Sequence, residues 1–166
     1  MWSDGALGIG PNLVQDTGPH QFVAEAIGGF FFYTNTNGGG ATLPAGSGSW
    51  SSLSDRNAKD DITTLDGASL LEKVASLPIS AWHYKGQAAS IRHVGPMAQD
   101  FHAAFGVGED DKHISTVDAE GVALASVQAL YQTVTELKKN LDEKSREVEE
   151  LRARLAHLEQ SIGTRP

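Results

Sequence analysis

A hydroxyl and an amine lie five positions apart in the stretch LSDRNAKDD, which spans residues 53–61. The hydroxyl belongs to Ser54 and the amine belongs to Lys59. A serine hydroxyl becomes a good nucleophile when a base takes its proton, and a lysine is such a base only where burial or a neighbouring positive charge lowers its pKa. Arg56 could supply that charge, whereas the acidic pair that ends the stretch would oppose it. These residue types allow attack on an adjoining carbonyl, but a turn or cap role is the plainer alternative for a spacing that is common in linkers.

The composition of the chain limits its partners. A formal net charge of −8 over 166 residues argues against nucleic acid or an anionic membrane, because those surfaces attract clusters of Lys and Arg. There is no cysteine, and the six histidines lack the spacing of metal ligands, so we expect no metal and no other cofactor. No apolar run is long enough to span a bilayer, and the amino end MWSDGALGIG does not resemble a signal peptide.

Residues 1–53 predict a β-rich segment, because short apolar runs such as HQFVAEAI and GFFFYTN alternate with turn clusters such as NTNGGG and PAGSGS. Such a segment is too short to close a β core of its own. We therefore expect the end of a larger fibre-like or adhesin-like structure, or strands that other copies of the chain complete. GALGIGPN, at residues 5–12, is more simply a β turn than a phosphate-binding loop, because Pro11 interrupts it.

Residues 54–118 predict a small α+β core. The run SLLEKVASL indicates a helix that Pro78 ends, since its apolar residues recur at helical spacing. ISAWHYK alternates like a strand, and IRHVGPMAQDFHAAFG predicts a strand and then a helix that opens with Pro96 and ends before Gly106. The apolar side chains of these two helices, which we expect in the core, are Leu70, Leu71, Val74, Leu77, Met97, Phe101 and Phe105.

Residues 119–166 predict one long helix, for which Asp118 is the expected N-cap. Its apolar side chains recur at alternating spacings of three and four, and only Lys144 breaks the pattern. These side chains are Val127, Leu130, Val134, Leu137, Leu141, Val148, Leu151, Leu155, Leu158 and Ile162. A helix left single in solvent would keep this stripe wet, at about 1.5–3 kcal/mol for each large side chain. A coiled coil is therefore expected.

The charges beside the stripe predict the direction of that coiled coil. With Val127 at heptad position a, two g-to-e pairs have opposite charges, as parallel helices in register require. The pairs are Glu147 with Arg152 and Arg154 with Glu159. The mixture of Leu and Val at positions a and d does not decide between a dimer and a trimer.

Several motifs, in order, resemble a known family. SLSDRNAKDDI, LLEKVASLPISAWHYK, RHVGPMAQDFHAAFG and STVDAEGVALASVQALYQ, which lie between residue 50 and about residue 160, are similar to the C-terminal intramolecular chaperone of phage endosialidases, tailspikes and tail fibres. They also resemble the self-cleaving domain of myelin regulatory factors. The resemblance implies an α+β fold with a β-rich stalk remnant, a small chaperone domain and a parallel trimeric coiled coil.

The same resemblance implies a function and a site. A homotrimer would assist the folding of the upstream β-rich part of the same polypeptide, and would then release itself as a self-cleaving serine peptidase that turns over once. Ser54 would be the nucleophile and Lys59 the base, with Asp55 completing the motif. The expected cut lies between Leu53 and Ser54, by an N-to-O acyl shift and ester hydrolysis, and a cut just after Ser54 is the alternative. The expected location is a phage virion tail, assembled in the host cytoplasm, or a bacterial cell surface.

Two functions from other classes remain open at this point. A trimerisation cap that never cleaves predicts a single species of 17.6 kDa. A receptor-binding tip predicts that exposed aromatic side chains stack on sugars, with Trp50, Trp82 and Tyr84 as candidates, although each is more simply a core or interface residue.

Overall fold

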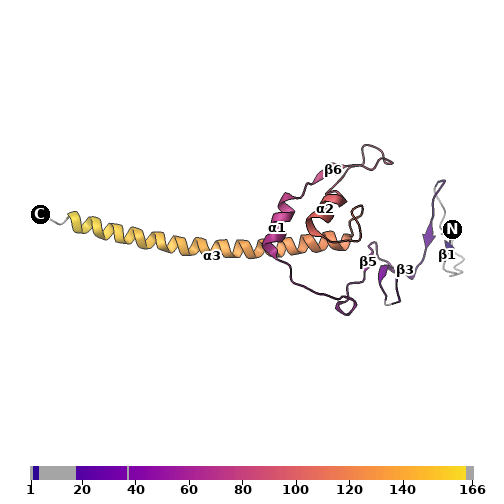
Figure 1. The fold of residues 1–166 in the computed structure, drawn as a ribbon, viewed down its shortest axis with the longest axis horizontal. Coiled ribbons are helices and arrows are strands. Elements are labelled where there is room, and N and C mark those ends of the chain that lie inside the picture. Colours follow the sequence, from indigo (N-terminus) through magenta and orange to yellow (C-terminus); the bar gives the residue numbers. More distant parts are fainter. Residues whose placement is uncertain (1, 4–17, 37, 164–166) are drawn as a thin grey trace. The chain divides into compact units, whose positions relative to one another are not determined.

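The computed structural model describes residues 2–3, 18–36 and 38–163, and the chain divides into two compact units, residues 1–63 and 64–166 (Figure 1). The fold is α+β, with small sheets and one long C-terminal helix, as the sequence predicts. The predicted turn at residues 5–12 lies outside the described residues.

The first unit holds two small sheets. β1 (Trp2–Ser3) and β2 (Ala24–Glu25) form a parallel pair, and β3 (Gly29–Tyr33), β4 (Gly40–Pro44) and β5 (Ser51–Ser52) form an antiparallel sheet in that order. The register of the second sheet places Tyr33 opposite Gly40 and Ala41 opposite Ser52. β5 therefore ends at Ser52, directly before Leu53. Its pairing with β4 fixes the position at which Leu53 leaves the sheet.

Aromatic side chains lie on both faces of this sheet. Along β3, Phe30 stacks on Phe32 with ring centroids 6.4 Å apart, and Phe31 stacks on Tyr33 at 6.5 Å. Phe32 also contacts Trp50, at 5.7 Å. Most of these rings stay exposed, and so the sheet lacks the covered face that normally stabilises three short strands.

The second unit consists of α1 (Gly67–Ser76), β6 (Ser80–Trp82), β7 (His93–Gly95), α2 (Ala98–Phe105) and α3 (Thr116–Gly163). The carboxylate of Asp66 caps α1 by accepting the Ala68 N–H at 3.1 Å, and the helix ends two residues before Pro78. α1 packs on α2 and on the N-terminal part of α3 (Figure 1). The buried apolar side chains of the described chain lie at this junction and are Leu70, Phe101 and Ala129.

Three details of the sequence prediction for this unit are wrong. Met97 is extended and is the N-cap of α2, so the helix begins at Ala98 and not at Pro96. Met97 itself is 39% exposed, so it is not part of the core that Phe101 enters. Asp118 lies inside the first turn of α3 instead of capping it, since the helix begins at Thr116.

The predicted end of α2 is confirmed. α2 ends before Gly106, whose left-handed backbone, with φ 65°, terminates the helix at a residue without a Cβ. Asp118 stabilises the start of α3 from within the first turn, where a carboxylate faces the positive end of the helix dipole. The long helix is unbroken from Thr116 to Gly163.

α3 uses one face for its own chain and leaves another face open. Ser126 and Ala129 are buried where α1 packs, while Val127 and Leu130, which belong to the heptad stripe, are exposed. The whole stripe is exposed, from 45% at Val148 to 71% at Ile162. Lys144, at the interrupted position, pairs with Glu147 at 2.6 Å, which raises the pKa of the lysine and lowers that of the glutamate.

The accessible surface of the single chain is unusually large. It amounts to 14280 Å² for a chain of 17.6 kDa. A folded monomer of this mass exposes about 7,900 Å² by the usual scaling of surface with mass. A single copy therefore buries far less of its surface than an independent globular protein does.

The packing of α1 on α3 yields a stability prediction. A Cβ placed on Gly67 would lie 2.9 Å from the Cβ of Ala129, so Gly67→Ala is expected to destabilise this junction by about 1–3 kcal/mol. Gly121→Ala is the matched control, since a Cβ there meets no atom within 4 Å and the change favours a helix by about 1 kcal/mol. Thermal unfolding followed by circular dichroism measures both. Equal shifts for the two variants would contradict close packing at Gly67.

Candidate functional site

The stretch that carries the candidate residues folds into a short 3-10 turn, η1 (Arg56–Ala58), capped by Asp55. The carboxylate of Asp55 accepts the backbone N–H of Asn57 at 2.9 Å and its side-chain amide at 3.2 Å. The backbone N–H of Lys59 then bonds the Arg56 carbonyl at 3.2 Å. The cap role that the sequence allowed for this position is thus the one that Asp55 performs, and the turn it stabilises reverses the chain between Ser54 and Lys59.

This turn brings the predicted nucleophile and the predicted base into contact. Nζ of Lys59 donates a hydrogen bond to Oγ of Ser54, with the two atoms 2.8 Å apart. Both side chains are exposed in the single chain. An ammonium that donates to the hydroxyl does not remove its proton, but a neutral amine at the same distance would accept that proton. The geometry fits a general base, and the proton state has to be set by the surroundings.

The surroundings include a cavity of about 280 Å³ in the first unit. Its lining includes Leu53, Asp55 and Lys59, together with Asn35 and Gly39 from the turn between β3 and β4 and Gly40 at the start of β4. Leu53, the residue before Ser54, is 43% exposed. Within the described part of the chain, neither Asp60 nor Asp61 forms an ion pair with Lys59.

The sequence did not indicate that the β3–β4 turn shares a cavity with Lys59. NTNGGG predicts a turn, and that prediction is confirmed, but a local pattern carries no information about which distant residues a turn will contact. The one usable signal was the run of glycines, because glycine is frequent where a backbone approaches another segment closely.

The aromatic side chains considered for sugar stacking contact one another. Trp82, Tyr84 and His93 form a cluster with ring centroids 4.9–5.5 Å apart, and Gln87 bonds Nε2 of His93 at 2.9 Å. Trp50 rests against Phe32. These contacts are those of small structural clusters on β6, β7 and the hairpin.

The acidic loop before α3 is organised around Asp110. Its carboxylate accepts the backbone N–H groups of Lys112 and His113, both at 2.8 Å, and lies 2.9 Å from Nδ1 of His113. These bonds, the one from the His113 side chain above all, lower the pKa of Asp110 to about 2. Over the residues that the structure describes, no group of three or more His, Asp or Glu side chains could hold a metal ion.

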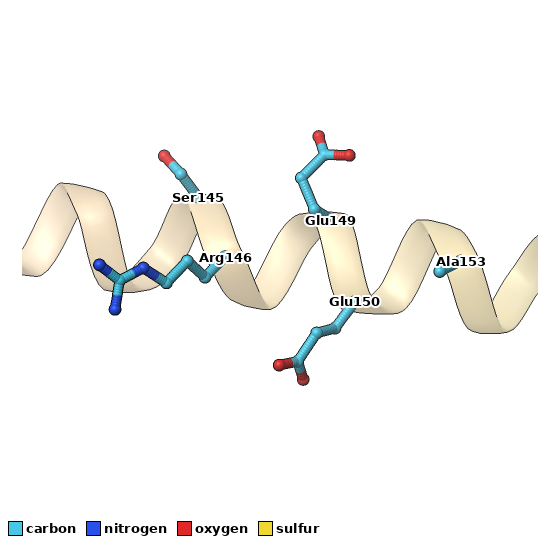
Figure 2. Close-up of a pocket in the computed structure, with 5 residues that line it drawn as sticks. All are labelled: Ser145, Arg146, Glu149, Glu150 and Ala153. Carbon is cyan, nitrogen blue, oxygen red and sulfur yellow. The ribbon is translucent and has the colours of Figure 1, made fainter.

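The polar face of α3 carries a hollow of about 560 Å³, lined by Ser145, Arg146, Glu149, Glu150 and Ala153. Figure 2 shows that all of these residues project from a single stretch of helix, with Ser145 and Glu149 on one side and Arg146 and Glu150 on the other. A single helix cannot enclose a ligand, so this hollow is an open part of the surface of α3. Of the helices in the described ranges, none has the length and apolarity to cross a membrane.

The fold and the site together define a class of protein. A serine and a lysine in hydrogen-bond contact precede a small α+β unit, which continues into a long helix with an open apolar stripe. Residues 54–107 match the sequence family described as chaperone of endosialidase, which supports the resemblance seen in the sequence. The match begins at Ser54 itself. No curated protein matches the chain.

The match to this family bears on function. It implies an intramolecular chaperone role, suggests self-cleaving peptidase activity and implies an association with phage tails. It does not favour the glycan-binding tip or the cap that never cleaves.

Proposed function

We propose that this protein is an assembly-dependent chaperone that trimerises, assists the folding of the β-rich segment upstream, and then cuts itself off beside Ser54. The observation that carries the proposal is the hydrogen bond of 2.8 Å between Lys59 and Ser54, one residue after the accessible Leu53. Residues 1–53 would be the end of the structure whose folding is assisted, and residues 54–166 would be the released chaperone, with its core in residues 54–118 and its coiled coil in residues 119–166.

The proposed reaction uses one water molecule and no cofactor. Lys59, as the neutral amine, takes the proton of the Ser54 hydroxyl while Oγ attacks the carbonyl carbon of Leu53. The bond from that carbon to the Ser54 nitrogen breaks, the nitrogen receives the proton, and an ester joins Leu53 to Oγ. Water then hydrolyses the ester, which leaves a carboxylate on Leu53 and a free amino group on Ser54.

The lysine needs to be neutral, and assembly offers a way to achieve this. In the single chain the side chain of Lys59 is exposed to solvent. Packing of neighbouring copies around the site would remove water and favour the neutral amine. Cleavage would then follow trimer formation and would act as a checkpoint on folding.

The partners in the proposed assembly are two further copies of the chain, joined in parallel along the stripe of α3. Three observations favour copies of this chain as the occupant of that face. The stripe is continuous apart from Lys144, the g and e charges are complementary when identical helices lie in register, and a single copy exposes far more surface than its mass predicts. The assembly would belong to a phage tail or to a bacterial cell surface.

The mass of the purified chain tests the proposed cleavage. After incubation at a concentration that permits assembly, mass spectrometry is expected to show fragments 1–53 and 54–166, and Edman sequencing should find serine, and then aspartate, at the new amino end. A new end that begins at Asp55 would move the cut to the far side of Ser54. A chain that stays at 17.6 kDa would favour the cap that never cleaves.

A further inference from the structure

The cavity that Lys59 lines is lined also by residues of the β3–β4 turn and of the start of β4. Asn35 and Gly39 belong to this turn and Gly40 begins β4, and all three lie upstream of the part of the chain that matches the chaperone family. The cavity is therefore built from both sides of the expected cut. Folding of the upstream hairpin and completion of the cavity are the same event.

Local bonds fix the shape of this turn. Oδ1 of Asn35 accepts the N–H of Gly39 at 2.8 Å, and the N–H of Thr34 bonds the Gly39 carbonyl at 2.7 Å. Gly40 has φ 151°, and a Cβ there would collide with the carbonyl oxygen of Phe32. Only a glycine at that position lets β4 begin where it does.

The same strand also places the scissile residue. β4 pairs with β3 on one side and with β5 on the other, and the pairing of Ala41 with Ser52 sets the start of Leu53. The turn and the peptide to be cut are thus held at a fixed distance by one strand. A shift of the hairpin would displace both walls of the cavity.

We propose that the β3–β4 turn is part of the cleavage site, with Asn35 as a positioning residue, so that the chain cuts itself only after this upstream hairpin has folded. This inference rests on the proposed self-cleavage and adds a second requirement to it. Assembly through α3 would bring the copies together, and the folded hairpin would signal that the segment upstream of the cut is in its native form.

Gly39→Ala isolates the role of the turn. An added Cβ would press on the side-chain amide of Asn35, which is the end of a flexible side chain and can move while the strands stay paired. Displacement of the Asn35 side chain near the reacting groups is expected to slow cleavage by about 10–10² fold. Gly48→Ala is the matched control, because a Cβ there meets nothing within 4 Å, and it is expected to cleave at the unmodified rate. Near-ultraviolet circular dichroism of the Trp50–Phe32 contact reports whether the hairpin persists.

Asn35→Asp adds a measurement that a purely structural role would not change. Aspartate keeps an oxygen that can accept the Gly39 N–H, but it places a carboxylate in the cavity beside Lys59. The titratable groups that already line this cavity are Asp55 and Lys59. A new carboxylate favours the ammonium form of the lysine, so the pH profile of the cleavage rate is expected to move to higher pH.

The outcomes separate this inference from the proposal on which it rests. Slow cleavage by Gly39→Ala, with normal cleavage by Gly48→Ala and a shifted profile for Asn35→Asp, supports it. Cleavage of Gly39→Ala and Asn35→Asp at the unmodified rate and pH would overturn the role of the turn and leave self-cleavage intact. An unmodified chain that never cleaves would remove both.

Discussion

Ser54→Ala is expected to leave the chain as one species of 17.6 kDa under conditions in which the unmodified chain separates into two fragments. Alanine removes the Oγ atom that lies 2.8 Å from Lys59, and no ester can form without it. Ser51→Ala is a matched control, because Ser51 lies in the same strand-and-loop segment and does not line the cavity. Denaturing electrophoresis and intact mass resolve the two results. Fragments from the alanine variant would show that this hydroxyl is not the nucleophile.

Lys59→Arg extends the same experiment to the base. Arginine keeps the positive charge and can donate to Oγ of Ser54, but it does not lose its proton in proteins. If Lys59 only held the serine in place, the arginine variant would still cleave. If it removes the proton, cleavage is expected to slow by about 10²–10⁴ fold.

The second prediction with a large effect concerns the apolar stripe of α3. Leu151→Glu is expected to abolish trimers and, with them, cleavage. A buried leucine contributes about 1.5–3 kcal/mol, so the loss from one layer of a trimer is roughly 5–9 kcal/mol before the repulsion of three carboxylates is added. That loss corresponds to a fall of about 10³–10⁶ fold in the association constant. Sedimentation velocity measures the oligomer, and the fragment assay measures cleavage on the same sample.

A glutamate on the outer face of the same helix serves as the control. Ala153 lies two residues further along, among the solvated side chains of Figure 2, and Ala153→Glu is expected to leave both assembly and cleavage unchanged. A Leu151→Glu chain that is monomeric and still cleaves would separate the two processes. A Leu151→Glu chain that remains trimeric would place the interface elsewhere.

The periodic parts of the chain could be predicted from the sequence. α1 and α3 follow from the spacing of their apolar residues, and the end of α2 follows from Gly106. The start of α2 could not be predicted as well, because proline is favourable both in the first helical turn and just before it, and only the extended backbone of Met97 decides between the two. Helix starts are set by such single residues, and periodicity does not locate them.

One part of the candidate site could be predicted from the sequence and another part could not. The contact of Ser54 with Lys59 is local, since one capped turn creates it, and the order of residues in LSDRNAKDD was enough to suggest it. The approach of Asn35 to the same cavity depends on the register of three strands. No pattern within a short window encodes that register, so this half of the cavity was missed.

The two faces of α3 have separate roles, so one face can be changed without the other. α1 packs on the side of α3 that carries Ser126 and Ala129, whereas Val127 and Leu130 are exposed. In the proposed assembly, the contacts of α1 with α3 and the contacts of the stripe with neighbouring copies can therefore change independently in evolution. In the proposed assembly, the stripe could be replaced by one that specifies another oligomeric state without changing the residues that pack on α1.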